Sequence, residues 1–257
     1  MFDQLIPAHQ LVRKNTTFEF TGMDSLALCK DKDWFLAYTD PISYTINNWG
    51  FRDRDQNDIS GRYVAVGDSF TLGLGQPFDQ IWSKQLASIL QEDVINLSLD
   101  GASNTWIIEI LKTILPKKPK AVFVMLSFAH RELQFNKNGT VDHLHLDLLL
   151  EDKQMLMNKF LMHYKLIREL EIEHQIPILV SAIPNFDLLK FSITNKLNII
   201  KYKRLMDQIG FFTSNLESKF KKINDIARDG YHFGPKTSRE IAENFSKALL
   251  DLPNNHC

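Results

Sequence analysis

Apolar residues in this chain gather in four short runs that are separated by stretches of helical periodicity. The runs cover residues 63–66, 94–97, 121–126 and 176–182, and their β-branched side chains predict strands. Residues 121–126 include no polar side chain, which is typical of a strand covered on both faces. The alternation of strands and helices predicts a mostly parallel sheet with helices on both faces.

The helical stretches carry apolar residues every three or four positions. We expect crossover helices over residues 78–90 and 102–115, a long covering helix over 147–174, and a last helix over 236–250 that begins after Gly234 and Pro235. Residues 1–60 break the alternation, because their aromatic residues are mixed with turn formers. We expect an N-terminal extension of short strands or loops (1–60) packed on a core of residues 61–257, as one domain.

The composition excludes several classes of protein. The 257 residues are 44% hydrophobic and 24% charged, which excludes disorder, collagen and coiled coil. With 30 basic and 31 acidic side chains, the chain is a poor candidate for nucleic-acid binding by phosphate neutralisation. Cys29 and Cys257 are too far apart in sequence to suggest a metal site or a disulfide framework.

Membrane and export signals are also missing from the sequence pattern. No stretch approaches the ~20 apolar residues of a membrane span, and the first residues lack the apolar run and cleavage site of a secretory signal. We therefore expect a cytoplasmic protein with no membrane partner. The oligomeric state stays open.

The first chemical motif is a serine at the end of the first predicted strand. Gly67, Asp68 and Ser69 follow this strand and precede a helical pattern, so Ser69 is expected at the carboxyl edge of the parallel sheet, where ligands of open α/β folds bind. Unpaired N–H groups at the start of the next helix suit developing negative charge. By itself, Gly-Asp-Ser is a common turn tripeptide.

The second motif lies just before the last predicted helix. Asp229 and His232 are three residues apart, a spacing that lets the carboxylate orient the imidazole while the other ring nitrogen faces a nucleophile. Taken alone, the pair is better accounted for by a surface histidine in a helix-initiating turn.

Together, the two motifs resemble the SGNH or GDSL-type hydrolase superfamily, in its bacterial or phage-like members. The resemblance implies Ser69 as nucleophile, His232 as general base and then acid, and Asp229 as the orienting carboxylate, with no cofactor and no metal. It also implies that backbone N–H groups of Ser69 and Gly101 hold the oxyanion, and that the fold is a flavodoxin-like three-layer α/β/α sandwich. Asn47-x-x-Gly50-Phe51-Arg52 is similar to an element upstream of the serine in many such proteins.

The third block of the family departs from its usual Gly-x-Asn-Asp pattern. The family's asparagine donates to the oxyanion, and here Ala129 or His130 stands in its place. Loss of one such donor typically lowers kcat by ~10²–10³. His130 is the first candidate to replace it, and the others are Asn104, Ser127 and Arg131. Arg131 and Glu132 are more simply interpreted as pairing with each other or flanking the entrance.

These residues predict a serine ester hydrolase acting on a small acyl ester, such as an O-acetyl group on a carbohydrate. An O-acyltransferase with the same triad is an alternative, because the acyl-enzyme is shared and only the acceptor differs. A non-catalytic carbohydrate-binding or structural module on a degraded hydrolase fold is a second alternative, motivated by the missing asparagine.

Three further features favour ordinary structural roles. His143 and His145, with Asp142 and Asp147 nearby, are expected in a solvated loop rather than at a metal, since a third ligand at recognisable spacing is missing. The basic stretch 190–222 predicts the solvated face of a helical insertion. Trp49, Phe51 and Trp106 are expected in the core or at its rim rather than on a sugar-binding surface.

Overall fold

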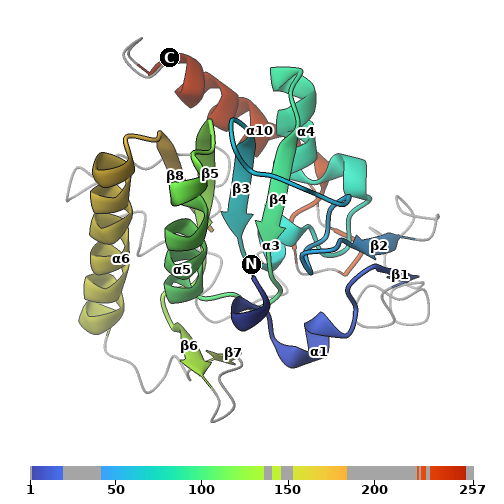
Figure 1. The fold of residues 1–257 in the computed structure, drawn as a ribbon, viewed down its shortest axis with the longest axis horizontal. Helices are drawn as coiled ribbons and strands as arrows, with labels where there is room; N and C mark the ends of the chain where they lie inside the picture. Colours follow the sequence, from blue (N-terminus) through green and yellow to red (C-terminus); the bar gives the residue numbers. More distant parts are fainter. Residues whose placement is uncertain are drawn as a thin grey trace.

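The computed structural model describes residues 2–19, 42–135, 141–145, 153–183, 225, 227–229 and 232–252 (Figure 1). Its centre is a four-stranded parallel sheet in the spatial order β4-β3-β5-β8. The strands are β3 (Tyr63–Gly67), β4 (Val94–Ser98), β5 (Ala121–Leu126) and β8 (Ile178–Ala182). All four predicted strands are confirmed, and the last begins two residues late, at Ile178, after Pro177 has accepted a hydrogen bond from Val122 N.

The register of the sheet brings the carboxyl ends of three strands to one edge. Tyr63 pairs with both Val94 and Ala121, so β3, β4 and β5 start level with one another. Because the first strand lies between the second and the third, the sheet has its topological switch point beside β3, where ligands of open α/β sheets bind. The residues that follow β3, β4 and β5 therefore share this edge.

Helices cover both faces of the sheet, which confirms the three layers predicted from the alternation (Figure 1). On one face, α5 (Asn104–Ile114) and α6 (Lys153–His174) pack on Val64 and Val122. On the other, α4 (Trp82–Leu90) and α10 (Pro235–Leu250) pack on Ala65 and Phe123. Every residue of β3, β4, β5 and β8 is buried, as expected for strands sandwiched between two helical layers.

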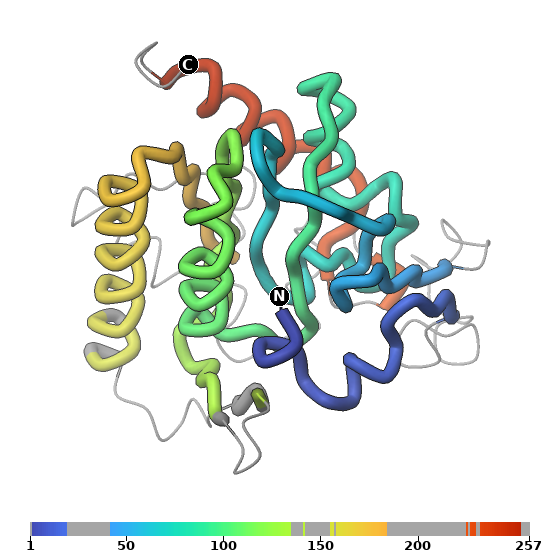
Figure 2. Tube along the Cα trace, in the orientation of Figure 1, coloured from blue at the N-terminus to red at the C-terminus, as the bar shows by residue number. Residues whose placement is uncertain are grey.

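The N-terminal segment runs past the carboxyl ends of β3 and β4 (Figure 2). It contains η1 (Asp3–Leu5), α1 (Ala8–Leu11) and the antiparallel pair of β1 (Thr16–Glu19) with β2 (Ser43–Ile46). Phe2 is buried against Phe51, with ring centroids 5.2 Å apart, and Leu5 O accepts a hydrogen bond from Trp106 Nε1 at 2.6 Å. Phe51 and Trp106 are therefore core residues, as predicted, and Trp49 packs against the same core.

A hairpin follows β5 and corrects one expectation. β6 (Arg131–Phe135) pairs antiparallel with β7 (Val141–His145), so His143 and His145 lie in a strand and the predicted solvated loop is wrong there. Within the described ranges, the structure holds no cluster of metal-ligating side chains. Asp147, the basic stretch 190–222, Cys29 and Cys257 lie outside the described residues. In the part of the chain that is described, none of the helices is long and apolar enough to cross a membrane.

Candidate active site

Ser69 lies in a tight strand–turn–helix connection. β3 ends at Gly67, and Asp68 caps the short helix α3 (Ser69–Leu72) by accepting a hydrogen bond from Phe70 N through Oδ1 at 3.0 Å. A Cβ at Gly67 would lie 2.1 Å from Thr71 Oγ1, so only glycine lets the chain turn this tightly. The sequence prediction of a strand, a turn and a helix around Ser69 is confirmed.

The structure brings Ser69, His232 and Asp229 into one hydrogen-bonded chain. His232 Nε2 lies 2.9 Å from Ser69 Oγ, and His232 Nδ1 lies 2.5 Å from Asp229 Oδ2. The other carboxylate oxygen, Oδ1, accepts a hydrogen bond from His232 N at 3.0 Å. Only 1% of Ser69 and 3% of His232 is exposed. The carboxylate thus holds one ring nitrogen of His232 while the other faces the hydroxyl, which is the geometry of a serine nucleophile with its base.

The loop that carries Asp229 and His232 docks directly on the turn that follows Ser69. Arg228 N donates to Gly75 O at 3.0 Å, and Gln76 Nε2 donates to Phe233 O at 2.6 Å. The buried Gln76 also accepts a hydrogen bond from Ser238 Oγ of α10 through Oε1 at 2.8 Å. Gln76 therefore joins the two halves of the site, a role that sequence reasoning missed because its partners lie more than 150 positions away.

Arg52 holds the same turn from the opposite side. Its buried guanidinium donates to the carbonyls of Leu72, Gly73 and Gln76 at 3.1, 2.7 and 2.8 Å. Asn47 closes the preceding turn, since its Oδ1 accepts from Phe51 N at 3.0 Å. The segment that contains Asn47, Phe51 and Arg52 thus supports the backbone behind the nucleophile.

The two backbone N–H groups that the sequence predicts as oxyanion donors belong to Ser69 and Gly101, which follow β3 and β4. The N–H groups of Ser69 and Gly101 have no acceptor among the described residues. Gly101 has a φ of +71°, in the left-handed region that glycine favours. It follows β4 at the same edge of the sheet at which Ser69 follows β3. Leu99 N donates to Gly67 O at 3.3 Å, which ties the two segments together.

Asn104 and His130, two of the four side chains predicted as further oxyanion donors, have different surroundings. Asn104 Nδ2 donates to Ser127 O at 3.0 Å and its Oδ1 accepts from Ser127 N at 2.6 Å, so this amide links the start of α5 to the residue after β5. The His130 ring packs on Phe128, with centroids 5.4 Å apart. The roles of Asn104 and His130 as oxyanion donors stay predictions.

Arg131 makes a buried ion pair that contradicts its expected pairing with Glu132. Arg131 Nη1 lies 2.5 Å from Asp68 Oδ2 and 3.0 Å from Ser127 Oγ, while Glu132 pairs with Lys159. Arg131 and Glu132 are neighbours in β6, where successive side chains point to opposite faces, so they cannot meet each other.

The pair sits between the segment that contains Ser69 and the segment that contains Gly101. Asp68 precedes Ser69, and Arg131 Nη1 also lies 3.5 Å from Ala102 O, next to Gly101. Burial raises the pKa of the Asp68 carboxyl above its ordinary value, and Arg131, Ser127 and the N–H of Phe70 oppose that shift. Arg131 Nε is buried without a hydrogen-bond partner in the described part of the chain.

Comparisons with known proteins found likenesses among solved structures. No family model and no curated protein sequence matches the chain. A protein assigned to the lipolytic G-D-S-L family of Desulfitobacterium hafniense is 20% identical, with a TM-score of 0.45 over 73% of this chain and 99% of that one. A G-D-S-L family member from Veillonella parvula is 15% identical, with a TM-score of 0.45 over 74% and 99%.

A carbohydrate esterase family 2 enzyme with its carbohydrate-binding domain, from Myceliophthora fergusii, is also similar. It is 15% identical, with a TM-score of 0.44 over 77% of this chain and 68% of that one. In the order of its motifs from Ser69 to His232, the chain resembles the GDSL-type hydrolases.

Proposed function

We propose that this protein is a serine ester hydrolase. The observation that carries the proposal is the hydrogen-bonded chain in which His232 bridges Ser69 Oγ at 2.9 Å and Asp229 Oδ2 at 2.5 Å. A buried serine hydroxyl is a weak nucleophile unless a neighbouring base takes its proton, and His232 stands at hydrogen-bond distance for that transfer.

In the acylation step, Ser69 Oγ attacks the carbonyl carbon of the ester while its proton moves to His232 Nε2. Asp229 stabilises the resulting imidazolium and keeps the Nδ1–H tautomer in place. The carbonyl oxygen becomes an oxyanion, which the N–H groups of Ser69 and Gly101 would receive. Collapse of the tetrahedral intermediate breaks the bond to the alcohol, and His232 returns the proton to the leaving oxygen.

In the deacylation step, water takes the place of the alcohol. His232 accepts a proton from the water as it attacks the acyl carbon, and the same N–H groups stabilise the second oxyanion. The bond to Ser69 Oγ then breaks, the carboxylic acid leaves, and the proton returns to the serine. Apart from this water, each step is carried out by side chains and backbone groups named above. The substrate we propose is a small acyl ester, with an O-acetyl carbohydrate as its specific form.

A fluorophosphonate probe tests the proposal, because it forms a covalent bond only with an activated serine. We expect the native protein to be labelled, and Ser69→Ala and His232→Ala to lose labelling. Ser88→Ala is the matched control, since Ser88 is an exposed serine on α4 that takes no part in the site. Absence of labelling in the native protein contradicts the hydrolase proposal, and labelling that survives in Ser69→Ala shows that another residue is the nucleophile.

A further inference from the structure

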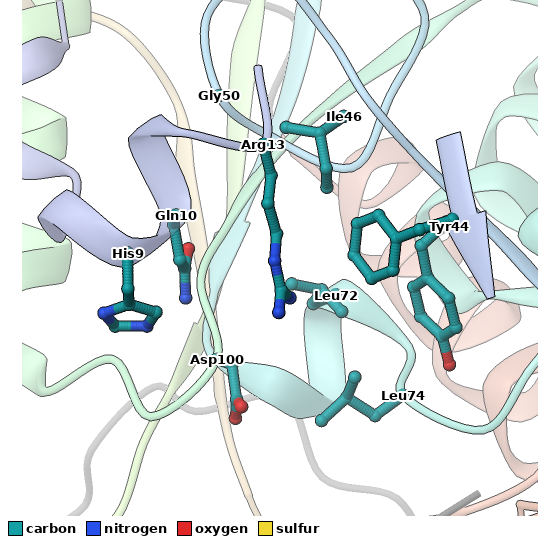
Figure 3. Close-up of a pocket in the computed structure, with 10 residues that line it drawn as sticks. His9, Gln10, Arg13, Tyr44, Ile46, Gly50, Leu72, Leu74 and Asp100 are labelled. Atoms are coloured by element: carbon teal, nitrogen blue, oxygen red, sulfur yellow. The ribbon is translucent and has the colours of Figure 1, made fainter. Parts of the chain in front are cut away.

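A hollow of about 260 Å³ lies beside the candidate active site, between the N-terminal segment and the turns that follow β3 and β4 (Figure 3). One side of it is polar and the other is apolar. The polar side chains are His9, Gln10, Arg13 and Asp100, and the apolar ones are Phe18, Tyr44, Ile46, Leu72 and Leu74. The hollow therefore offers both hydrogen-bonding groups and an apolar surface to one ligand.

The hollow shares its walls with the catalytic segments. Leu72 ends the short helix α3 that begins at Ser69, and Ser69 O accepts a hydrogen bond from Leu74 N at 3.3 Å. On another side of the hollow, Asp100 immediately precedes Gly101, whose N–H faces the oxyanion in the proposed mechanism. A group bound in the hollow would thus lie next to both segments that act on the ester.

Stacked side chains hold the apolar wall in place. The Arg52 guanidinium lies 4.0 Å from the centroid of the Tyr44 ring, which stacks on Phe18 at 5.8 Å. The Arg13 guanidinium lies 4.6 Å from the Phe18 centroid and points into the hollow (Figure 3). The Tyr44 hydroxyl accepts a hydrogen bond from Gly75 N at 2.8 Å. Stacking on Phe18 restricts the exposed Arg13 side chain before a ligand arrives, which lowers the entropy that binding costs.

The hollow is lined by two opposite charges, those of Arg13 and Asp100, which form no ion pair with each other. Within the described residues, neither the Arg13 guanidinium nor the Asp100 carboxylate has a hydrogen bond or an ion pair. A ligand with one sign of charge would be attracted by one of them and repelled by the other. A neutral polyhydroxylated ring suits both, since each hydroxyl can donate to Asp100 and accept from Arg13. Its C–H face fits the apolar wall.

We propose that this hollow binds the alcohol part of the ester as a single neutral sugar ring. The size agrees with one ring rather than a chain, because the volume lies just below the ~300–1,000 Å³ that is usual for small-molecule sites. The inference rests on the proposed ester hydrolysis for its link to catalysis, while binding of the sugar itself needs no reaction. The N-terminal segment, which supplies Arg13 and Phe18, thereby becomes part of substrate recognition.

The test measures binding separately from catalysis. Methyl glucoside, methyl galactoside and methyl mannoside are titrated into the Ser69→Ala protein by calorimetry or NMR. We expect at least one of them to bind with a Kd in the range of ~1–10 mM, a weak affinity suited to one ring held by few contacts. Arg13→Gln and Asp100→Asn should each weaken that binding about tenfold, as loss of a charged hydrogen-bond partner does.

Arg239→Gln is the matched control, because Arg239 is an exposed arginine on α10 that is outside the hollow and is paired with Glu243. Saturable binding that Arg239→Gln keeps and Arg13→Gln loses supports the inference. The inference is overturned if no methyl glycoside binds, if Arg13→Gln and Asp100→Asn bind as well as the parent, or if a zwitterion such as alanine binds in preference to the glycosides.

The fluorophosphonate experiment keeps the two proposals apart. Labelling of the native protein without glycoside binding leaves the hydrolase proposal standing and removes the sugar site. Glycoside binding without labelling leaves a sugar site but contradicts its role in ester hydrolysis.

Discussion

Asp68 Oδ2 and Arg131 Nη1 lie 2.5 Å apart in the interior, where 0% of the Asp68 side chain and 6% of the Arg131 side chain is exposed. The pair joins the residue before the nucleophile to the start of β6, 63 positions further along the chain. A buried ion pair contributes little net stability, but removal of one partner leaves an unpaired buried charge. Arg131 is therefore expected to matter for stability as well as for the shape of the site.

Replacement of Arg131 by Gln should lower the free energy of unfolding by about 3–5 kcal/mol, because the Asp68 carboxylate then lacks its cation. In Asp68→Asn/Arg131→Gln both charges are gone, and we expect this double variant to recover a large part of the loss. Urea denaturation of both single variants, the double variant and the parent gives the coupling energy. Additive single effects would contradict a direct ion pair.

The sequence could predict elements whose signal is local. The apolar runs predicted the four strands of the central sheet, and the helical periodicity predicted α4, α5 and α10 to within a few residues of their observed bounds. The meeting of Ser69 and His232 followed from the family resemblance rather than from any local pattern. The contacts of Arg131, Gln76 and Arg52 were not predictable, because each partner is distant in sequence and is chosen by the packing of whole elements.

Local reasoning failed where neighbours in sequence do not face each other. Arg131 and Glu132 have opposite charges and adjacent positions, which suggested a pair, but the strand β6 turns their side chains to opposite faces. His143 and His145 failed similarly. The missing third metal ligand led us to expect a solvated loop, whereas the backbone pairs in register with residues 131–135.

Asp229→Asn should reduce kcat by about 10⁴ while it leaves the fold in place, since an amide of the same shape stabilises the wrong tautomer of His232 and no longer balances the imidazolium. Hydrolysis of p-nitrophenyl acetate and the rate of fluorophosphonate labelling measure the effect. Asp251→Asn, an exposed aspartate just after α10, is the control and should keep the parent rate. A loss below about tenfold would contradict the orienting role of Asp229.

Because of His163 in α6, we expect the free energy of unfolding to fall in acid. Its ring is buried, and its Nε2 lies 3.2 Å from Thr105 Oγ1. Burial lowers the pKa of His163 from its ordinary value of 6.5. The Glu132 charge opposes this shift, the Lys159 charge adds to it, and the Lys159 backbone opposes it. Below pH 6.5, His163 therefore binds a proton in the unfolded chain but stays neutral in the folded chain until the pH reaches its lowered pKa.

The free energy of unfolding should consequently fall as the pH drops below 6.5, down to the lowered pKa of the folded state, and be unaffected by this residue at higher pH. His163→Gln removes the titrating group, so its unfolding free energy should depend less on pH between 6.5 and 5 than that of the parent. His9→Gln, on the exposed side of α1, should keep the parent slope. Equal slopes in His163→Gln and the parent would rule out this contribution.

Gly75 offers a way to separate the position of the triad from its chemistry. It has a φ of +73°, and a Cβ there would lie 2.9 Å from Asp229 N and 3.0 Å from the Ala227 Cβ. Because these atoms belong to the backbone and to a short side chain, the loop that carries Asp229 and His232 must move away from the turn after Ser69. A shift of about 1 Å at a reacting group can cost ~10² in rate.

Gly75→Ala should therefore lower kcat by about 10², with labelling by the fluorophosphonate slowed to the same extent. Gly61→Ala is matched to it in backbone conformation, since Gly61 has a φ of +66°, but a Cβ there would meet nothing within 4 Å. Both variants pay the cost of ~1–2 kcal/mol for a left-handed non-glycine residue, so similar losses of stability are expected from that source. Only Gly75→Ala should lose activity. If Gly61→Ala loses as much, the cause is general destabilisation and not displacement of His232.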